Sequence, residues 1–373
     1  MLLSAPVRLG IVGCGIVSKA YLTNLKASPH VEVLACSDQV LETARERAAQ
    51  FEVARVCTTD ELLADPEVEL VVNLTIPTAH AEISLAALAA GKHVYTEKPL
   101  ATTRELGRRV LDAAAEGGLT VGGAPDTFLG AGIQTCLRLM AQGEVGEALA
   151  ASGFMLEGGP ENWHPNPAFF YQPGGGPLLD MGPYYLTTLV CLLGPVRRVS
   201  GMARVLYPER TADRGPRAGE TFKVNTDTFV AALIEFQSGA LATLVTSMGI
   251  TGHDLPDMQV YCTKGILRVP DPNTFGGPIR FRPGDEKSSW EEVGLQYGHT
   301  DGVKNYRGLG VIEMAQALRE RVQPRASGEL AYHVLDVLLS ILESSASGRR
   351  VTVSSTCRRP PLLPLDVGLV AAP

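Results

Sequence analysis

Short apolar segments alternate with helix-length segments through the first third of the chain. Residues Val7–Val12 are apolar and rich in branched side chains, and a helix-length segment follows from Val17 to about Ala27. The alternation repeats, with further strand-like segments at Val31–Ser37, Leu70–Leu74 and through Val94. Strands and helices in strict alternation are typical of a parallel sheet covered by helices on both faces. The pattern predicts a doubly wound α/β domain, which we assign to residues 1–123.

Two sequence signals predict where helices of this domain begin. Thr58-x-x-Glu61 has the form of a capping box, in which a threonine and a glutamate bond each other's backbone amides. Thr102-x-x-Glu105 has the same form and is expected to cap a helix that ends at Gly117–Gly118.

The pattern changes after about Ala124. Strand-like segments then follow one another without intervening helices, at Ala148–Leu156, Arg197–Tyr207, Thr228–Phe236, Ala240–Ser247 and Met258–Val269. This order predicts an α+β domain with a large, mostly antiparallel sheet over residues 124–373. Helices expected at 183–193, 311–321 and 329–345 can cover one face of that sheet, and Phe229–Ile234, apolar on both faces, suggests that both are covered. Pro208–Val224, rich in charge and broken by glycine and proline, is expected to be an exposed loop or arm.

Composition narrows the class of protein. The chain has 373 residues, enough for about two domains, and its 45% hydrophobic and 20% charged residues are those of an ordinary globular protein. The formal charge of −7 is spread without long runs, which argues against nucleic-acid binding, and no apolar run is long enough to span a membrane. Seven scattered cysteines without a C-x-x-C pair argue against disulfides and zinc, so we expect a cytoplasmic protein without a metal.

A glycine-rich turn follows the first strand. Gly13-Cys14-Gly15-Ile16-Val17-Ser18 has the form G-x-G-x-x-S, in which serine replaces the last glycine of the dinucleotide-binding fingerprint. Gly13 would make the tight turn, and Gly15 would let the backbone approach a pyrophosphate. The phosphates would then lie against free amides at the helix start, including those of Ile16 and Val17. The turn predicts a Rossmann domain that binds a nicotinamide dinucleotide.

Asp38 ends the second predicted strand, roughly 20 residues after the glycines, where a carboxylate can bond the adenosine ribose hydroxyls. A 2′-phosphate would be repelled there and no arginine directly follows, so NAD is favoured over NADP. The loop Thr75-Ile76-Pro77-Thr78-Ala79-His80 follows another strand, and we expect Thr75, Pro77 and His80 near the cofactor.

Glu97-Lys98-Pro99 follows the strand through Val94. Proline cannot donate to a sheet, so the strand should end there and leave Lys98 at its carboxyl end. Ligands of open parallel sheets bind at that edge. We expect Glu97 and Lys98 beside the cofactor, with burial next to a cationic nicotinamide lowering the pKa of Lys98.

The glycine turn, Asp38, the Thr75-to-His80 loop and Glu97-Lys98-Pro99 together resemble the glucose-fructose oxidoreductase / inositol dehydrogenase family (Gfo/Idh/MocA). The segment from Gly174 to Tyr184 is similar to that family's second signature, G-G-G-x-x-x-D-x-G-x-H, with Tyr184 in place of the histidine. The resemblance implies that Lys98, Asp180 and Tyr184 are catalytic and contact substrate, with Lys98 or Tyr184 moving the proton. Asp180 would orient the substrate hydroxyl or Lys98, and its charge would oppose the lowering of the Lys98 pKa. It also implies a homodimer or homotetramer formed through the second-domain sheet.

Other candidate residues lie in the second domain. Trp163 and His164, in a segment stiffened by prolines, are expected to contact substrate. His299-x-Asp301 has the spacing of two metal ligands but lacks a clear third, so we expect a solvated loop.

These residues predict an NAD(P)-dependent oxidoreductase that transfers a hydride between a nicotinamide cofactor and a secondary alcohol of a sugar, polyol or related compound. One alternative is an NAD-dependent glycosidase that oxidises its substrate transiently. Another is a non-catalytic sensor of NAD or sugar, for which the replacement of histidine by Tyr184 is the support.

Overall fold

The first sheet of the computed structural model is parallel and has six strands. The structure describes residues 5–369 except 286, 302–303 and 367. The strand order is β3-β2-β1-β4-β5-β6, which is the Rossmann order. The strands are β1 (Val7–Val12), β2 (Val31–Ser37), β3 (Arg55–Val56), β4 (Leu70–Asn73), β5 (His93–Thr96) and β6 (Val121–Gly123). The alternation of apolar and helical segments therefore predicted this sheet correctly.

Helices connect these strands in parallel crossovers: α1 (Ser18–Lys26), α2 (Leu41–Phe51), α3 (Thr59–Ala64), α4 (His80–Ala89) and α5 (Arg104–Gly117). The capping box at the start of α3 is confirmed, because Thr58 Oγ1 accepts from the Glu61 amide at 3.2 Å and Glu61 Oε2 accepts from the Thr58 amide at 2.9 Å. The cap predicted at Thr102 is wrong by one residue. Thr103 caps α5 instead, accepting from the Leu106 amide at 3.2 Å.

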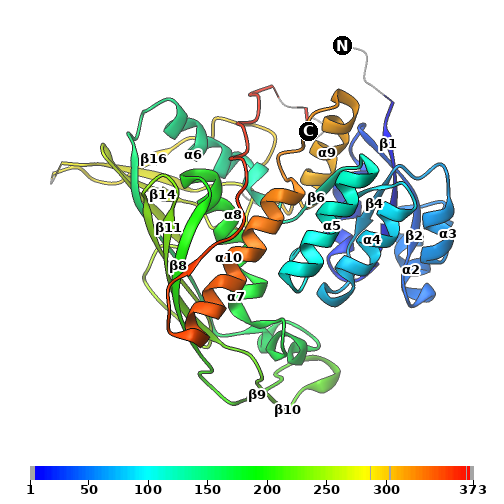
Figure 1. Cartoon of the computed structure of the whole chain (residues 1–373), viewed down its shortest axis with the longest axis horizontal. Coiled ribbons are helices and arrows are strands. Elements are labelled where there is room, and N and C mark those ends of the chain that lie inside the picture. Colours follow the sequence, from blue (N-terminus) through cyan, green and yellow to red (C-terminus); the bar gives the residue numbers. More distant parts are fainter. Residues whose placement is uncertain (1–4, 286, 302–303, 367, 370–373) are drawn as a thin grey trace.

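The second sheet has nine strands in the order β16-β15-β14-β13-β7-β12-β11-β8-β17 (Figure 1). Among the described residues of this sheet, β7 and β12 pair in parallel and every other neighbouring pair is antiparallel, so the mostly antiparallel sheet was predicted correctly. The strands are β7 (Ala148–Glu157), β8 (Val196–Arg204), β11 (Phe229–Phe236), β12 (Leu241–Met248), β13 (Met258–Cys262), β14 (Gly265–Val269), β15 (Ile279–Pro283), β16 (Glu291–Val293) and β17 (Val351–Thr352).

Two details of the second half of the chain go beyond the sequence pattern. Met258–Val269 is a hairpin of two strands, β13 and β14, because the chain turns at Thr263 and Lys264. The expected arm at Pro208–Val224 contains a small hairpin of its own, formed by β9 (Glu209–Thr211) and β10 (Thr221–Lys223).

Helices of the second half cover one face of the large sheet: α7 (Gly176–Asp180), α8 (Gly182–Leu193) and α10 (Gly328–Ser347). Helix α6 (Ala131–Ala141) packs against α8 and β14, whereas α9 (Leu309–Glu320) packs against α1 and β6 of the nucleotide-binding unit. Figure 1 shows α10, in orange, running between the large sheet and α5 of the nucleotide-binding unit. No helix in the described part of the chain is long and apolar enough to cross a membrane.

Candidate active site

Lys98 lies at the carboxyl edge of the parallel sheet, two residues after β5 ends at Thr96. Glu97 holds this turn, since its carboxylate accepts from the Tyr21 hydroxyl at 2.9 Å and from the Lys98 amide at 2.9 Å. Glu97 is buried, and both of its carboxylate oxygens have protein partners. It therefore positions Lys98, and its expected contact with the cofactor stays a prediction.

The second signature brings Asp180 and Tyr184 to the same place. Asp180 is the last residue of α7, and Tyr184 lies in the first turn of α8. Gly176, which begins α7, has a φ of +85°, and a Cβ there would lie 2.7 Å from the Asp227 carbonyl oxygen. A side chain at this position would push α7 away from the sheet, and Asp180 with it.

Lys98 and Asp180 form an ion pair. The Lys98 ammonium donates to Asp180 Oδ1 at 2.6 Å and to the Asp180 carbonyl at 2.7 Å. Burial lowers the pKa of Lys98, but the charge of Asp180, with Tyr184 and Glu97, outweighs burial and raises this pKa above its ordinary value. In the protein by itself, the opposing effect of Asp180, which lies at hydrogen-bonding distance, thus outweighs burial. A fall of this pKa beside a cationic nicotinamide stays a prediction.

Tyr184 is the third member of this cluster. Its ring centroid lies 5.3 Å from Lys98 Nζ and 5.6 Å from Arg307 Cζ, on which the guanidinium is centred. Arg307 Nη2 donates to the Tyr184 hydroxyl oxygen at 3.0 Å. The tyrosine thus lies close to two cations.

A cavity of about 370 Å³ opens onto these residues. Besides Lys98, Asp180 and Tyr184, its polar lining consists of Glu157, Asn273 and Arg307. Burial raises the pKa of Glu157, with Asp271 and Asp180 adding to the effect. These three polar residues were not predicted, because each lies on a strand end or loop with no motif around it. Their donors and acceptors suit a compound rich in hydroxyl groups.

Trp163 and His164 occupy different places at this cavity. Trp163 lines it and is 59% exposed, with its ring held edge-on by His164 and Phe170 at 5.4 and 5.9 Å. His164 is not part of the cavity lining; its Nδ1 accepts from the Asn166 amide at 3.1 Å. Trp163 thus lies in the cavity and His164 outside its lining, and substrate contacts of both residues stay predictions.

The glycine turn leaves room for a dinucleotide phosphate. Gly13 has a φ of +97°, and a Cβ there would lie 2.6 Å from the Leu74 carbonyl carbon, so only glycine fits. A Cβ on Gly15 would meet nothing within 4 Å. In the described chain, the amides of Gly15, Ile16 and Val17 have no acceptor, and no side chain caps α1. Uncapped amides at a helix start, facing open space, fit a bound phosphate.

Asp38 and an arginine flank this turn. The Asp38 carboxylate accepts from the Cys14 amide at 2.8 Å and from the Val40 amide at 2.9 Å, so its orientation is fixed. Arg47 of α2 donates to the Gly15 carbonyl at 3.2 Å and to the Cys14 carbonyl at 3.3 and 3.4 Å. Sequence spacing did not reveal Arg47, because its approach depends on how α2 packs.

His80 ties two loops of the sheet edge together. Its Nδ1 lies 2.6 Å from the Pro99 carbonyl and its Nε2 lies 3.0 Å from the Thr75 carbonyl. The ring is buried, and burial lowers the pKa of His80 against the opposing effect of the two carbonyls. His80 thus fixes the Thr75-to-Pro77 loop against the turn after Lys98. Direct contacts of Thr75, Pro77 and His80 with the cofactor stay predictions.

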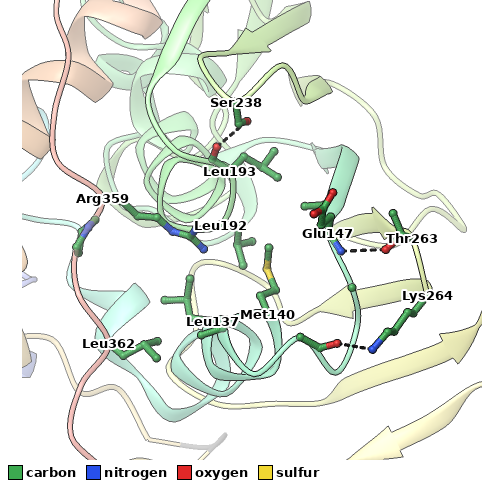
Figure 2. A pocket seen from close by; sticks show the side chains of 15 residues that line it. Leu137, Met140, Glu147, Leu192, Leu193, Ser238, Thr263, Lys264, Arg359 and Leu362 are labelled. Carbon is green, nitrogen blue, oxygen red and sulfur yellow. Dashed lines mark hydrogen bonds between the residues drawn. The ribbon is translucent and has the colours of Figure 1, made fainter.

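A larger cavity, of about 600 Å³, lies where α6 and α8 end (Figure 2). Its two cations are engaged with carbonyls of the helix ends: Lys264 Nζ donates to the Gly143 carbonyl at 2.8 Å, and Arg359 donates to the Cys191 carbonyl. Ser238 Oγ donates to the Leu193 carbonyl at 3.0 Å. Lysine and arginine here satisfy carbonyls that helix ends leave unpaired. We therefore assign this cavity no catalytic role.

The region of His299 and Asp301 has structural contacts. His299 Nε2 lies 2.8 Å from the Leu129 carbonyl, and Asp301 Oδ1 accepts from the Lys304 amide at 2.8 Å. Among the described residues, no three His, Cys, Asp or Glu side chains are grouped as metal ligands.

Two family models match the chain. Residues 7–123 match the model described as an oxidoreductase family with an NAD-binding Rossmann fold, and residues 133–268 match that of the GFO/IDH/MocA C-terminal domain.

Similar proteins match over most of their length. A 1,5-anhydro-D-fructose reductase from Ensifer adhaerens is 25% identical over 93% of this chain and 99% of its own length. An uncharacterised oxidoreductase from Rhizobium meliloti is 30% identical over 71% of this chain and 75% of its own. A levoglucosan dehydrogenase structure, in complex with NADH and levoglucosan, superposes with a TM-score of 0.81 at 21% identity, covering 94% of this chain and 100% of that one.

Proposed function

Because this chain belongs to the Gfo/Idh/MocA family of oxidoreductases, we propose that it transfers a hydride between NAD and a secondary alcohol of a sugar, polyol or related compound. The observation that carries the proposal is the Lys98–Asp180 ion pair, which lies beside Tyr184 in a cavity at the carboxyl edge of the nucleotide-binding sheet. Relatives named for 1,5-anhydro-D-fructose and levoglucosan support a sugar or a cyclic polyol as substrate.

The nucleotide-binding turn supports the cofactor part of the proposal. The free amides of Gly15, Ile16 and Val17 would hold the pyrophosphate, and Asp38 would accept from the adenosine ribose hydroxyls. When bound, the nicotinamide supplies or accepts the hydride. The protein must then hold the carbinol carbon in place and move the hydroxyl proton.

In this proposal, Lys98 and Tyr184 have different roles in proton transfer. A raised pKa means that Lys98 keeps its proton, so its ammonium donates a hydrogen bond to the substrate oxygen and stabilises negative charge there. Asp180 fixes the direction of the ammonium through the 2.6 Å contact. Tyr184 gives or takes the proton, and Trp163 offers its exposed ring face to the apolar side of a sugar.

The test is NADH formation at alkaline pH with a panel of sugars, inositols, anhydro sugars and sugar acids. We expect turnover by the wild type, a loss of about 100-fold or more in Lys98→Ala and in Tyr184→Phe, and no change in Lys287→Ala, an exposed lysine outside the cavity. Sugar release from glycosides without net NADH formation would instead favour the NAD-dependent glycosidase. NAD binding with no turnover of either kind would favour the sensor.

A further inference from the structure

Arg307 is an arginine of the cavity that no sequence motif includes. Its Nη2 donates to the Tyr184 hydroxyl at 3.0 Å and to Asn273 Oδ1 at 2.5 Å, while Nη1 donates to Asn305 Oδ1 at 3.1 Å. All three acceptors are neutral oxygens, so the positive charge is available to a group in the cavity. Burial lowers the pKa of Arg307, but Tyr184 and the nearby acids Glu97 and Asp126 outweigh burial, and the side chain stays charged.

The backbone around Arg307 is anchored to the nucleotide-binding half of the chain. Asn24 of α1 donates through Nδ2 to the Arg307 carbonyl at 2.8 Å. The next residue, Gly308, and Gly310 both donate their amides to Asp126 Oδ2 at 2.9 Å. Asp126 is 1% exposed and follows β6 closely in the chain. These contacts fix the direction in which the guanidinium reaches the cavity.

The contact with Arg307 determines which way the Tyr184 hydroxyl can donate. A phenol oxygen carries one hydrogen and accepts through its lone pairs. Arg307 occupies an acceptor direction, and within the described part of the chain the hydroxyl makes no hydrogen bond in which it donates. That hydrogen is therefore free to bond to a substrate oxygen in the cavity that Tyr184 lines.

We propose that Arg307 is a positioning residue that aims the Tyr184 hydroxyl at the substrate oxygen and stabilises the phenolate left when the proton departs. The inference rests on the proposed function. In the reducing direction, the Tyr184 O–H bond breaks and a new O–H bond forms on the substrate oxygen, while the carbonyl carbon accepts the hydride that NADH supplies. Water then returns a proton to the phenolate. Oxidation runs the same exchange backwards, with the substrate hydroxyl proton moving to Tyr184.

The test compares Arg307→Gln and Arg307→Lys in the wild-type and Tyr184→Phe backgrounds, with Arg45→Gln, an exposed arginine of α2, as the control. We expect Arg307→Gln to lower kcat by about 100-fold with KM and the NAD dissociation constant changed less than about 3-fold. Arg307→Lys should recover part of kcat. In the Tyr184→Phe background, Arg307→Gln should cost little more, because both changes remove the same proton transfer.

Equal losses of kcat in the two backgrounds would overturn the inference, as would an unchanged kcat in Arg307→Gln. A loss of folding would appear as a fall in the midpoint of thermal unfolding. Arg307→Lys, which keeps the positive charge, distinguishes such a loss from a loss of proton transfer. A second readout does not need turnover: in tyrosine-labelled protein, the NMR resonance that Tyr184→Phe removes should shift in Arg307→Gln and not in Arg45→Gln. A wild type without turnover would reject the proposed function, and an unshifted resonance would still reject the role of Arg307.

Discussion

Asp38 is the residue whose contacts bear most directly on the choice of cofactor. Its two carboxylate oxygens each accept one backbone amide, from Cys14 and Val40, and each keeps a lone pair for a further donor. Arg47 approaches the same turn from α2, where it donates to the Gly15 carbonyl at 3.2 Å. We propose that this carboxylate favours NAD over NADP, because it can accept from the ribose hydroxyls and would repel a 2′-phosphate.

We expect Asp38→Asn to lower the ratio of the NADP to the NAD dissociation constant by about 10-fold or more, because it removes a charge that bonds the ribose and repels the phosphate. Titration of both cofactors by protein fluorescence measures this ratio. Glu46→Gln, which removes an exposed charge from α2, is the matched control. A ratio that stays constant in Asp38→Asn would assign the selectivity to other residues.

Motif spacing identified some residues of the cavity and left others out. Lys98, Asp180 and Tyr184 were predicted because each lies in a motif, and the structure places all three in one cavity. Arg307 and Asn273 lie on loops whose course is set by long-range contacts, such as the bond from Asn24 to the Arg307 carbonyl. A local sequence pattern cannot predict a residue that is brought to a site by such long-range contacts.

At the scale of elements, α10 packs against β8 of the large sheet and forms a hydrogen bond with it through a histidine. His333 of this helix accepts from the Val196 amide of β8 through Nε2 at 2.9 Å, and its Nδ1 lies 2.9 Å from Ser355 Oγ. A ring nitrogen that accepts cannot carry a proton, so His333 is neutral. Burial lowers its pKa from 6.5 to about 4, against the opposing effects of Asp336 and Ser355.

This pKa gives a stability that depends on pH. The unfolded chain binds the proton near pH 6.5 and the folded chain only near pH 4, so the free energy of unfolding should fall as the pH is lowered between these values. The loss attributable to His333 is up to about 3 kcal/mol. Urea unfolding from pH 7 to pH 4 should show a weaker pH dependence in His333→Gln than in the wild type. The exposed loop histidine variant His253→Gln should follow the wild type, and identical slopes in all three proteins would contradict the assignment.

Elements were predicted where the local pattern is unambiguous. The range of β2 matches the sequence expectation residue for residue, because one apolar run lies between two turn signals. The hairpin of β13 and β14 was taken for a single strand, because Thr263 and Lys264 are not strong turn residues and the turn depends on pairing with β7 and β15. Thr103 caps α5 instead of Thr102, and the sequence pattern did not distinguish these two adjacent threonines because either can cap a helix.

At the scale of the whole molecule, the large sheet has one uncovered face. Met202, Leu233 and Leu241 of adjacent strands β8, β11 and β12 are 80%, 64% and 57% exposed. A cavity of about 600 Å³ lies over the same face. Apolar surface of this kind marks an interaction site. The expectation that both sheet faces are covered thus holds for one face within this chain, and we propose that a second copy covers the other.

Leu233→Glu should weaken such an assembly by about 100-fold or more, since it would bury an unpaired carboxylate between two sheets. Light scattering over a range of protein concentrations gives the mass directly. Val40→Glu, at a position of the nucleotide-binding unit that is 59% exposed, is the control and should keep the wild-type mass. A wild type that is monomeric at every concentration would refute the proposed dimer or tetramer.

The position of α10 also affects how the protein folds during synthesis. Tyr332 and Leu335 of this helix are buried in one hydrophobic cluster with Val94, Leu100 and Val110 of the nucleotide-binding unit. The first 123 residues thus contain all six strands of their sheet but not all of its core. A ribosome releases the N-terminal end of a chain first. During synthesis, the nucleotide-binding unit is therefore made before α10, whose side chains complete this part of its core.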